Sequence, residues 1–402
     1  MSQTDIKNLS GVTQMNKTKT VVLARKPETF PVYRVPLKYL YYNDQNDRIS
    51  TEIVRYRTEN NKELPTDIEE YNQIFEDLVV KSKEDAIVNT QNSIARRGQD
   101  NPGVTLKDGR VVDGNRRFTC LRRIQKVTNQ EQYFETIILD FDYENDYRYI
   151  KSLELELQMG VDEKVKYDPI DRLFGVYKSI RIEKAFTIEE YAALFDDYSV
   201  KDVKKDLELA ELMCEYLDFQ GSHGKYYIAK DMDLQGTLHE IPSILEKVKK
   251  KDPNLVDDVK LRIFASIGAG VSSRLNLFMR DIRDVIDGGD LKKYLDETED
   301  AVNNAIQALE ESPVQNYNDL SDGLRKRDDI KEGLITPVTT QKKAVDSKKL
   351  KKAPIKNSRD ALSTLNAIHI ESILDMSKDD RDELKRILGM LQDKISEIGG
   401  KI

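Results

Sequence analysis

A hairpin signal in the first third of the chain most constrains the fold. In VTLKDGRVV, a two-residue Asp108-Gly109 turn lies between two short β-branched runs, a strong short-range pattern for two antiparallel strands. The next residues, DGNRRFTCLRRI, are predicted to form a helix, and ETIILDFD returns as a strand rich in isoleucine. Strands and helices therefore alternate closely, which predicts an α+β domain over roughly the first 150 residues.

The rest of the chain has a different pattern. From Asp168 onward the hydrophobic spacing is almost wholly helical. A length of 402 residues is also too great for one ordinary core. We therefore expect, in chain order, a disordered arm (1–30), an α+β domain (31–165), a helix-turn-helix region (166–220), a helical domain (221–312), a basic linker (313–358) and a helical self-association segment (359–402).

Composition excludes several classes of protein. No apolar run approaches the roughly 18 residues that a membrane-spanning helix needs, and MSQTDIKNLSGVTQMNKTKT lacks the apolar core of a signal peptide. Two cysteines, Cys120 and Cys214, exclude a disulfide framework or a four-cysteine metal site. We expect a cytoplasmic protein with no membrane partner.

The start of the helix in DGNRRFTCLRRI has an unusual charge. The net charge of the chain is −8, yet Arg116 and Arg117 lie in a first turn, where the helix dipole already carries partial positive charge. Asp113 is placed as the N-cap, and Gly114 allows close approach of a ligand to the backbone. The pattern predicts a phosphate site formed by Asp113, Gly114, Asn115, Arg116 and Arg117. The alternative is a solvated basic face around a stripe of core residues.

Three carboxylates farther along the chain suggest a companion metal ion. Asp140, Asp142 and Glu144 alternate in DFDYEND, so a continuing strand would point them the same way, as candidate ligands for Mg²⁺ beside a triphosphate. The alternative is a solvated strand end that leads into a loop.

The arginine helix and its surroundings resemble the ParB/sulfiredoxin superfamily. VVDGNRRFTCLRRI is similar to the second conserved box, G-x-R-R-x-x-A, and VPLKYLYYNDQNDR is similar to the first box, with Asn43 and Arg48 at matching places but without its prolines. ELQMGVDEKVKYDPIDRLFGVYKSI is similar to the third box, although Gln158 lies farther from Pro169 than the family spacing. The resemblance covers roughly the first half of the chain.

The resemblance implies a fold and a ligand. The fold is an α+β ParB/sulfiredoxin-like domain followed by an all-α helix-turn-helix and helical domains, and the ligand is a nucleoside triphosphate, CTP or ATP, held by Arg48, Arg116 and Arg117. Hydrolysis is at most slow. Sulfinic acid repair is not expected, because the position after the motif glycine is Asn115 rather than the cysteine of sulfiredoxin.

A second motif follows the third box. Its distance from that box in the sequence is the one that the resemblance to ParB proteins implies for a DNA-binding helix-turn-helix. FTIEEYAALFDDYSVKDVKKDLELAELMCEYL begins with Thr187 and Glu190 at capping-box spacing, and a second helix starts at Ser199. Val200, Val203 and Leu207 are expected on its buried side. A short helix, a turn and a longer helix outline a helix-turn-helix, with DNA contacts from Ser199, Lys201, Lys204 and Lys205. The alternative is an ordinary pair of packed helices.

The last ninety residues are basic and then amphipathic. Residues 340–359 contain eight cations and one acid, a net charge of 8 − 1 = +7, in what we expect to be a flexible linker, with or without contacts to DNA phosphates. Beyond Ser377 an a/d pattern predicts a helix for self-association or for packing within the chain, with the apolar residues Leu384, Leu388, Leu391, Ile395 and Ile398.

Together these features predict a ParB-like protein that binds a nucleotide and DNA. Its expected role is a nucleotide-gated clamp in plasmid or chromosome partition or in gene regulation, with a second copy and, in segregation, a partner ATPase. One alternative is an NTPase, nuclease or phosphotransferase of anti-phage defence. Another is a regulator whose nucleotide pocket is vestigial.

Overall fold

The computed structural model describes residues 5–23, 26–82, 84–160 and 168–402. It divides the chain into two compact units, Met1–Val338 and Thr339–Ile402, and each is treated by itself. Part of the stretch that resembles a third box, residues 161–167, lies outside the described residues, as does the side chain of Gln158. No helix in the described part is both long enough and apolar enough to cross a bilayer.

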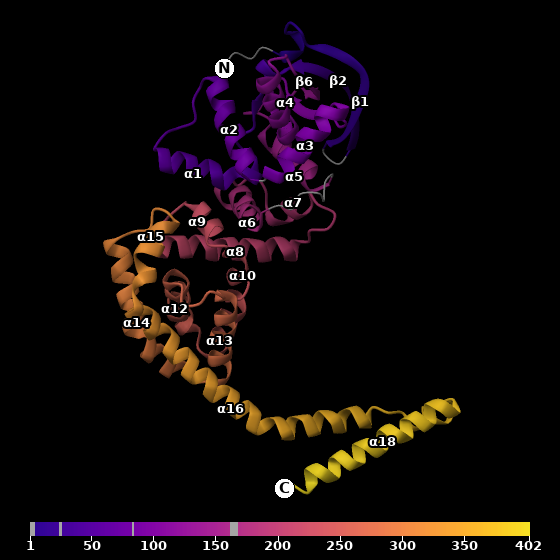
Figure 1. Cartoon of the computed structure of the whole chain (residues 1–402), viewed down its shortest axis with the longest axis vertical. Helices are drawn as coiled ribbons and strands as arrows, with labels where there is room; N and C mark the ends of the chain where they lie inside the picture. The colour runs from indigo at the N-terminus through magenta and orange to yellow at the C-terminus, as the bar shows by residue number, and fades with distance from the viewer. Residues whose placement is uncertain (1–4, 24–25, 83, 161–167) are drawn as a thin grey trace. The chain divides into compact units, whose positions relative to one another are not determined.

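The first unit begins with a mixed six-stranded sheet, drawn in indigo to magenta in Figure 1. Its strand order is β1-β2-β6-β4-β5-β3. The pairs β4·β6 and β3·β5 are parallel, and the other three pairs are antiparallel. The strands are β1 (Thr13–Leu23), β2 (Lys26–Pro36), β3 (Tyr41–Tyr42), β4 (Gly103–Leu106), β5 (Arg110–Asp113) and β6 (Tyr133–Leu139).

Helices cover both faces of this sheet. One core joins Val35, Tyr42 and Phe134 of the sheet to Phe75 and Phe118 of the helices. A second core, on the other side, joins the strands to Ile150 and Leu153. The helices of this region are α1 (Ser50–Asn60), α2 (Ile68–Ser82), α3 (Glu84–Arg97), α4 (Asn115–Thr128) and α5 (Tyr147–Gly160).

The remainder of the first unit is helical, as the periodicity predicts. The start of α6 follows from local chemistry, because the Asp168 carboxylate accepts a hydrogen bond from the Ile170 N–H at 2.9 Å and Pro169 occupies the first turn. The helices are α6 (Pro169–Tyr177), α7 (Ile188–Ala192), α8 (Val200–Phe219), α9 (Tyr226–Asp231), α10 (Gln235–Leu238), α11 (Ile241–Lys251), α12 (Val256–Ala269), α13 (Leu275–Gly288), α14 (Leu291–Glu311) and α15 (Tyr317–Asp322). An α+β part followed by a helical part is therefore confirmed.

The expectation of a disordered arm at 1–30 is wrong. Residues of that range form β1 and the start of β2, with Ile6 and Val21 buried. β1 carries few apolar residues because most of its side chains face solvent, so its sequence is polar although its backbone is paired. β2 pairs with β1 from Lys26 to Arg34, but with β6 only from Val32 onward, after Pro31.

The expectation of a flexible linker at 313–358 is also wrong. Much of that range is helical, in α15 and in α16 (Asp328–Asn366), which runs from the first unit into the second. The second unit continues with α17 (Ile370–Leu374) and α18 (Lys378–Gly399), and the Ser377 side chain caps α18 as its sequence predicts. Pro337 and Pro354 lie inside α16. Such prolines normally indicate a helix break, which is why the sequence favours a linker.

Candidate functional site

One edge of the sheet brings the first two motif segments together. β3 and β5 are parallel neighbours, with Tyr41 opposite Arg110 and Tyr42 opposite Val111. Their carboxyl ends therefore lie at the same edge, which is where ligands commonly bind to sheets of this kind. The segment that follows β3 contains Arg48, and the segment that follows β5 enters α4. The chain thus leaves β3 toward Arg48, and leaves β5 toward Arg116, at the same edge of the sheet. The segment after β3 then contacts Arg110 through Asp44, at 2.8 Å.

Gly114 connects β5 to α4 in a left-handed conformation, with φ = 98°. The first bond of the helix runs from the Phe118 N–H to the Gly114 carbonyl at 2.8 Å, and no side chain caps this end. The N–H groups of the first turn are therefore directed out of the helix end. A Cβ at Gly114 would lie 2.7 Å from Cζ of Phe134, so packing requires glycine here, independently of any ligand.

Asp113 is not the N-cap of α4, which corrects the sequence prediction. It is the last residue of β5, and Gly114 separates it from the helix. Its carboxylate accepts hydrogen bonds at 3.2 Å from both Lys19 Nζ and Arg117 Nη2. Burial lowers the pKa of Lys19, although Asp113 raises it. Asp113 thus neutralises part of the positive charge that the sequence leaves unmatched.

The four arginines of α4 have different roles. Arg122 is 5% exposed and forms ion pairs with Glu69 at 2.7 Å and Glu76 at 3.0 Å, so it belongs to the core. Arg123 donates through Nε to the Gln91 side chain at 3.2 Å. Arg116 and Arg117, in the first turn, are partly exposed. The solvated-face interpretation therefore fails for Arg122, and the ligand interpretation is restricted to Arg116 and Arg117.

Two buried polar atoms at the start of α4 have no hydrogen-bond partner in the described part of the chain. They are Oδ1 of Asn115 and Nε of Arg117. A buried polar atom without a partner costs about 1–3 kcal/mol, so a ligand that supplied both a donor and an acceptor here would recover that cost. The atoms belong to residues that the motif predicts for the site.

A buried charged network supports the segment after β3. Lys151 Nζ lies 2.7 Å from Asp47 Oδ1 and donates to the Gln45 carbonyl at 3.0 Å. Asn43 donates to Glu154 at 3.2 Å. The sequence around Lys151 gives no sign of this network, because Lys151 and Glu154 have the spacing of an ordinary exposed pair on a helix surface.

The three carboxylates suggested for Mg²⁺ lie at the opposite edge of the sheet. β6 is parallel to β4 and β4 is antiparallel to β5, so the residues after β6 lie where β5 begins. Asp142 accepts hydrogen bonds from the Asn145 backbone and side chain at 3.1 and 2.9 Å, which makes it part of a loop. No group of three potential ligands for a metal ion occurs among the described residues. Asp140, Asp142 and Glu144 are therefore not beside Arg116.

The helix pair α7 and α8 has the predicted caps. Thr187 and Glu190 form a capping box at α7, and Ser199 and Asp202 form another at α8. The Ser199 hydroxyl accepts a hydrogen bond from the Asp202 N–H at 3.3 Å, so Ser199 acts as a cap. The lysines of α8 that are candidates for DNA contacts are all exposed to solvent. They are Lys201, Lys204 and Lys205.

The buried side of α8 agrees with the prediction except at one position. Val203 and Leu207 are buried, whereas Val200 is 36% exposed, because it lies in the first turn, before the packed part of the helix. Asp206, an acidic residue of the same helix, accepts a hydrogen bond from Tyr198 at 2.5 Å and pairs with Arg172 at 2.6 Å. Its charge is thus neutralised inside the protein.

Comparison with known proteins gives little similarity. No protein-family model matches the sequence, and no curated protein matches it. The chain is similar to a solved structure of a Pnob8-like ParB-N domain, with 13% sequence identity and a TM-score of 0.35 over 73% of this chain and 100% of that chain. At that score the likeness does not establish a shared fold.

Proposed function

We propose that the chain is a ParB-like protein that binds a nucleoside triphosphate, CTP or ATP, at the start of α4 and duplex DNA through α8. The observation that carries the nucleotide proposal is the pair of partnerless buried atoms, Asn115 Oδ1 and Arg117 Nε, in a helix end with no side-chain cap. A helix N-terminus with guanidinium groups binds phosphate oxygens, and Asn115 Oδ1 would accept a hydrogen bond from the sugar or base.

Each of the site residues has a specific part in this proposal. Arg116 and Arg117 bind the phosphates, and Arg48 approaches them from the neighbouring segment after β3. Asp113 orients Arg117 through its 3.2 Å contact. Mg²⁺ would accompany the nucleotide without ligands from Asp140, Asp142 or Glu144. Because the Asp113 carboxylate beside Arg117 is already paired with both Lys19 and Arg117, turnover is expected to be slow or absent.

The partners follow from two exposed surfaces. Lys201, Lys204 and Lys205 are exposed along the first two turns of α8, and lysines in such positions bind DNA phosphates. No residue of α18 is buried within this chain, and Leu388, Ile395 and Ile398 are 43%, 62% and 44% exposed. A second copy of α18 would cover them, which supports a homodimer. In a segregation role the protein would work in the cytoplasm with a partner ATPase.

Calorimetric titration of the full chain with CTP, ATP and GTP, each with Mg²⁺, tests the nucleotide site. We expect one of them to bind, with affinity at least about tenfold weaker in Arg116→Ala and Arg117→Ala, the equivalent of losing about 1.4 kcal/mol. Arg97→Ala, at the exposed end of α3, is the matched control. Wild-type protein that binds none of the three would refute the proposal, as would arginine variants that behave like the control.

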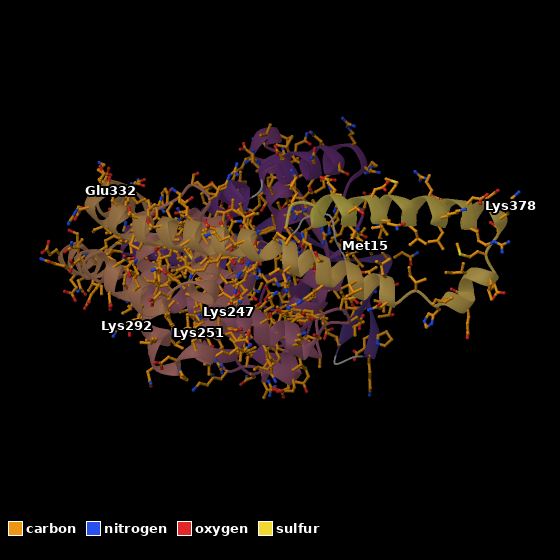
Figure 2. All side chains as sticks on the ribbon, turned by 90° about the horizontal axis from the view of Figure 1, so that it is seen from below. Met15, Lys247, Lys251, Lys292, Glu332 and Lys378 are labelled. Carbon is orange, nitrogen blue, oxygen red and sulfur yellow. The ribbon has the colours of Figure 1, made fainter. Side chains whose placement is uncertain are left out.

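Two further measurements separate this function from its alternatives. Rapid multiple-turnover phosphate release that Arg116→Ala abolishes would identify an NTPase. Duplex binding that Lys201→Gln/Lys204→Gln/Lys205→Gln weakens, and that Lys249→Gln/Lys292→Gln/Lys293→Gln leaves unchanged, supports the α8 contact. Lys292, an exposed control position, is labelled in Figure 2. DNA binding that no nucleotide affects would indicate a regulator with a vestigial pocket.

A further inference from the structure

The second half of α16 is a helix without packing partners. From Ser347 to Asn366 no side chain is buried, and only Ala353 and Leu365 are partly covered. A helix in a folded protein ordinarily buries an apolar stripe, because packing supplies most of its stability. Packing within the chain therefore does not explain the sequence of this segment.

Six cations of this segment lie on one side of the helix. At 100° per residue they fall within an arc of roughly 160°, and from first to last they extend over about 17 Å of the helix axis. We call this set the basic stripe, and it consists of Lys348, Lys349, Lys351, Lys352, Lys356 and Arg359.

The basic stripe is largely unneutralised by the chain itself. None of the ion pairs within the described residues involves Lys348, Lys351, Lys352, Lys356 or Arg359, whereas Lys342, earlier in α16, pairs with Asp346 at 2.8 Å. Cations four residues apart, such as Lys348 and Lys352, repel each other along a helix. An extended polyanion would relieve this repulsion.

The distribution of apolar side chains decides between two kinds of polyanion. A helix that binds an anionic membrane needs a continuous apolar face opposite its cations. Here Leu350 lies opposite the basic stripe, but Ile355 and Leu362 fall within its arc. There is no apolar face to insert, whereas the phosphate backbone of DNA requires only positive charge at suitable spacing.

We propose that the basic stripe of α16 is a second DNA contact, which binds duplex phosphates without reading their sequence. This inference rests on the proposed function, since it takes DNA as the ligand of the protein. It adds a surface remote in sequence from the helix-turn-helix, and it predicts that affinity for DNA of any sequence depends strongly on salt.

Fluorescence anisotropy of the full chain with a random-sequence duplex, over a series of salt concentrations, tests the inference. Lys348→Gln/Lys351→Gln/Lys352→Gln removes three cations and keeps good helix formers. The slope of log K against log salt should become shallower by about 2.7, three contacts at about 0.9 each. Affinity at low salt should fall at least about tenfold.

The matched control is Lys378→Gln/Lys385→Gln/Lys401→Gln, which removes the same charge from exposed positions of the second unit. Lys378, at the start of α18, is labelled in Figure 2. This variant should retain the slope and affinity of the wild type, and circular dichroism should show equal helix content in both triple variants.

These measurements distinguish failure of the basic-stripe inference from failure of the proposed function. If the basic-stripe variant matches its control while the α8 variant loses DNA, the inference is overturned and the proposed function stands. If the wild type binds vesicles of phosphatidylserine but no duplex, the basic stripe is a membrane surface and the inference is again overturned. If neither duplex nor vesicles bind while nucleotide does, both DNA contacts are refuted and only the nucleotide site stands.

Discussion

Lys151 and Asp47 form an ion pair of 2.7 Å in which each side chain is 1% exposed. Burial alone would lower the pKa of Lys151, but the carboxylates of Asp47 and Glu154 raise it above its ordinary value. The pair joins α5 to the segment after β3. It thus fixes the backbone that leads to Arg48.

Replacing Lys151 with methionine should therefore destabilise the protein. The change leaves Asp47 and Glu154 buried without their cation, which typically costs about 3–5 kcal/mol. Urea denaturation measures the loss. Lys394→Met, which breaks an exposed 2.8 Å pair with Glu397, should cost less than about 1 kcal/mol. Equal stability of the two variants would show that the buried pair has no structural importance.

The arginines of α4 should separate into two classes. Arg122→Ala leaves Glu76, 6% exposed, paired with Lys126 at 3.0 Å but without its guanidinium, and should lower the free energy of unfolding by about 1–3 kcal/mol. Arg116→Ala should change it by less than about 1 kcal/mol but weaken nucleotide binding. Denaturation and calorimetry on both variants check this separation. A stable Arg122→Ala that loses nucleotide would reverse the assignment.

Two glycines provide a matched test of the junction between β5 and α4. Gly98 and Gly114 both have positive φ, but a Cβ at Gly98 meets nothing within 4 Å, whereas at Gly114 it meets Phe134. Gly98→Ala should cost about 1 kcal/mol from the backbone alone. Gly114→Ala should cost about 1–3 kcal/mol more, because Phe134 must move. Thermal unfolding of both variants measures the difference, and similar melting temperatures would contradict it.

Asp171 should make stability depend on pH. Burial raises its pKa to about 6, against the opposing effect of Lys230, whereas an unfolded aspartate titrates near about 3.9. The folded state therefore binds the proton more readily between these values. The contribution of Asp171 to stability is fully present below about pH 4 and is lost as the pH rises through about 6, by up to about 3 kcal/mol.

Asp171→Asn removes this titration. Stability curves from pH 4 to 7 should show the wild type losing stability relative to Asp171→Asn as the pH rises. The exposed Asp375→Asn should run parallel to the wild type. A constant difference between wild type and Asp171→Asn across the range would exclude the titration of this group.

The sequence predicts those parts of the fold that are specified by residues close together in the chain. The Asp108-Gly109 turn gives the β4–β5 hairpin, and the caps at Thr187 and Ser377 mark the starts of α7 and α18. Each depends on chemistry within a few residues. β1 pairs with the strand that follows it, but most of its side chains are polar and face solvent, so its sequence lacks the alternation of apolar and polar residues that indicates a strand.

The candidate site was predictable to a similar extent. Spacing alone identifies Gly114, Arg116 and Arg117, but it cannot distinguish them from Arg122, whose partner Glu76 lies on another helix. Because β3 and β5 are parallel, the chain leaves β3 toward Arg48 at the same edge at which it leaves β5 toward Arg116. The pairing of β4 with β5 and β6 moves Asp140 to the opposite edge. Both outcomes depend on strand direction, which residue patterns do not specify.

The end of the pairing between β2 and β6 at Val32 affects how the protein behaves in concentrated solution. The stretch of β2 before that point has neighbours on only one side, and an unpaired strand edge can recruit strands from other molecules. Pro27 and Pro31 have no N–H to donate, so this edge is a poor template for fibril growth. The two prolines should therefore protect a paired but exposed part of the sheet from aggregation.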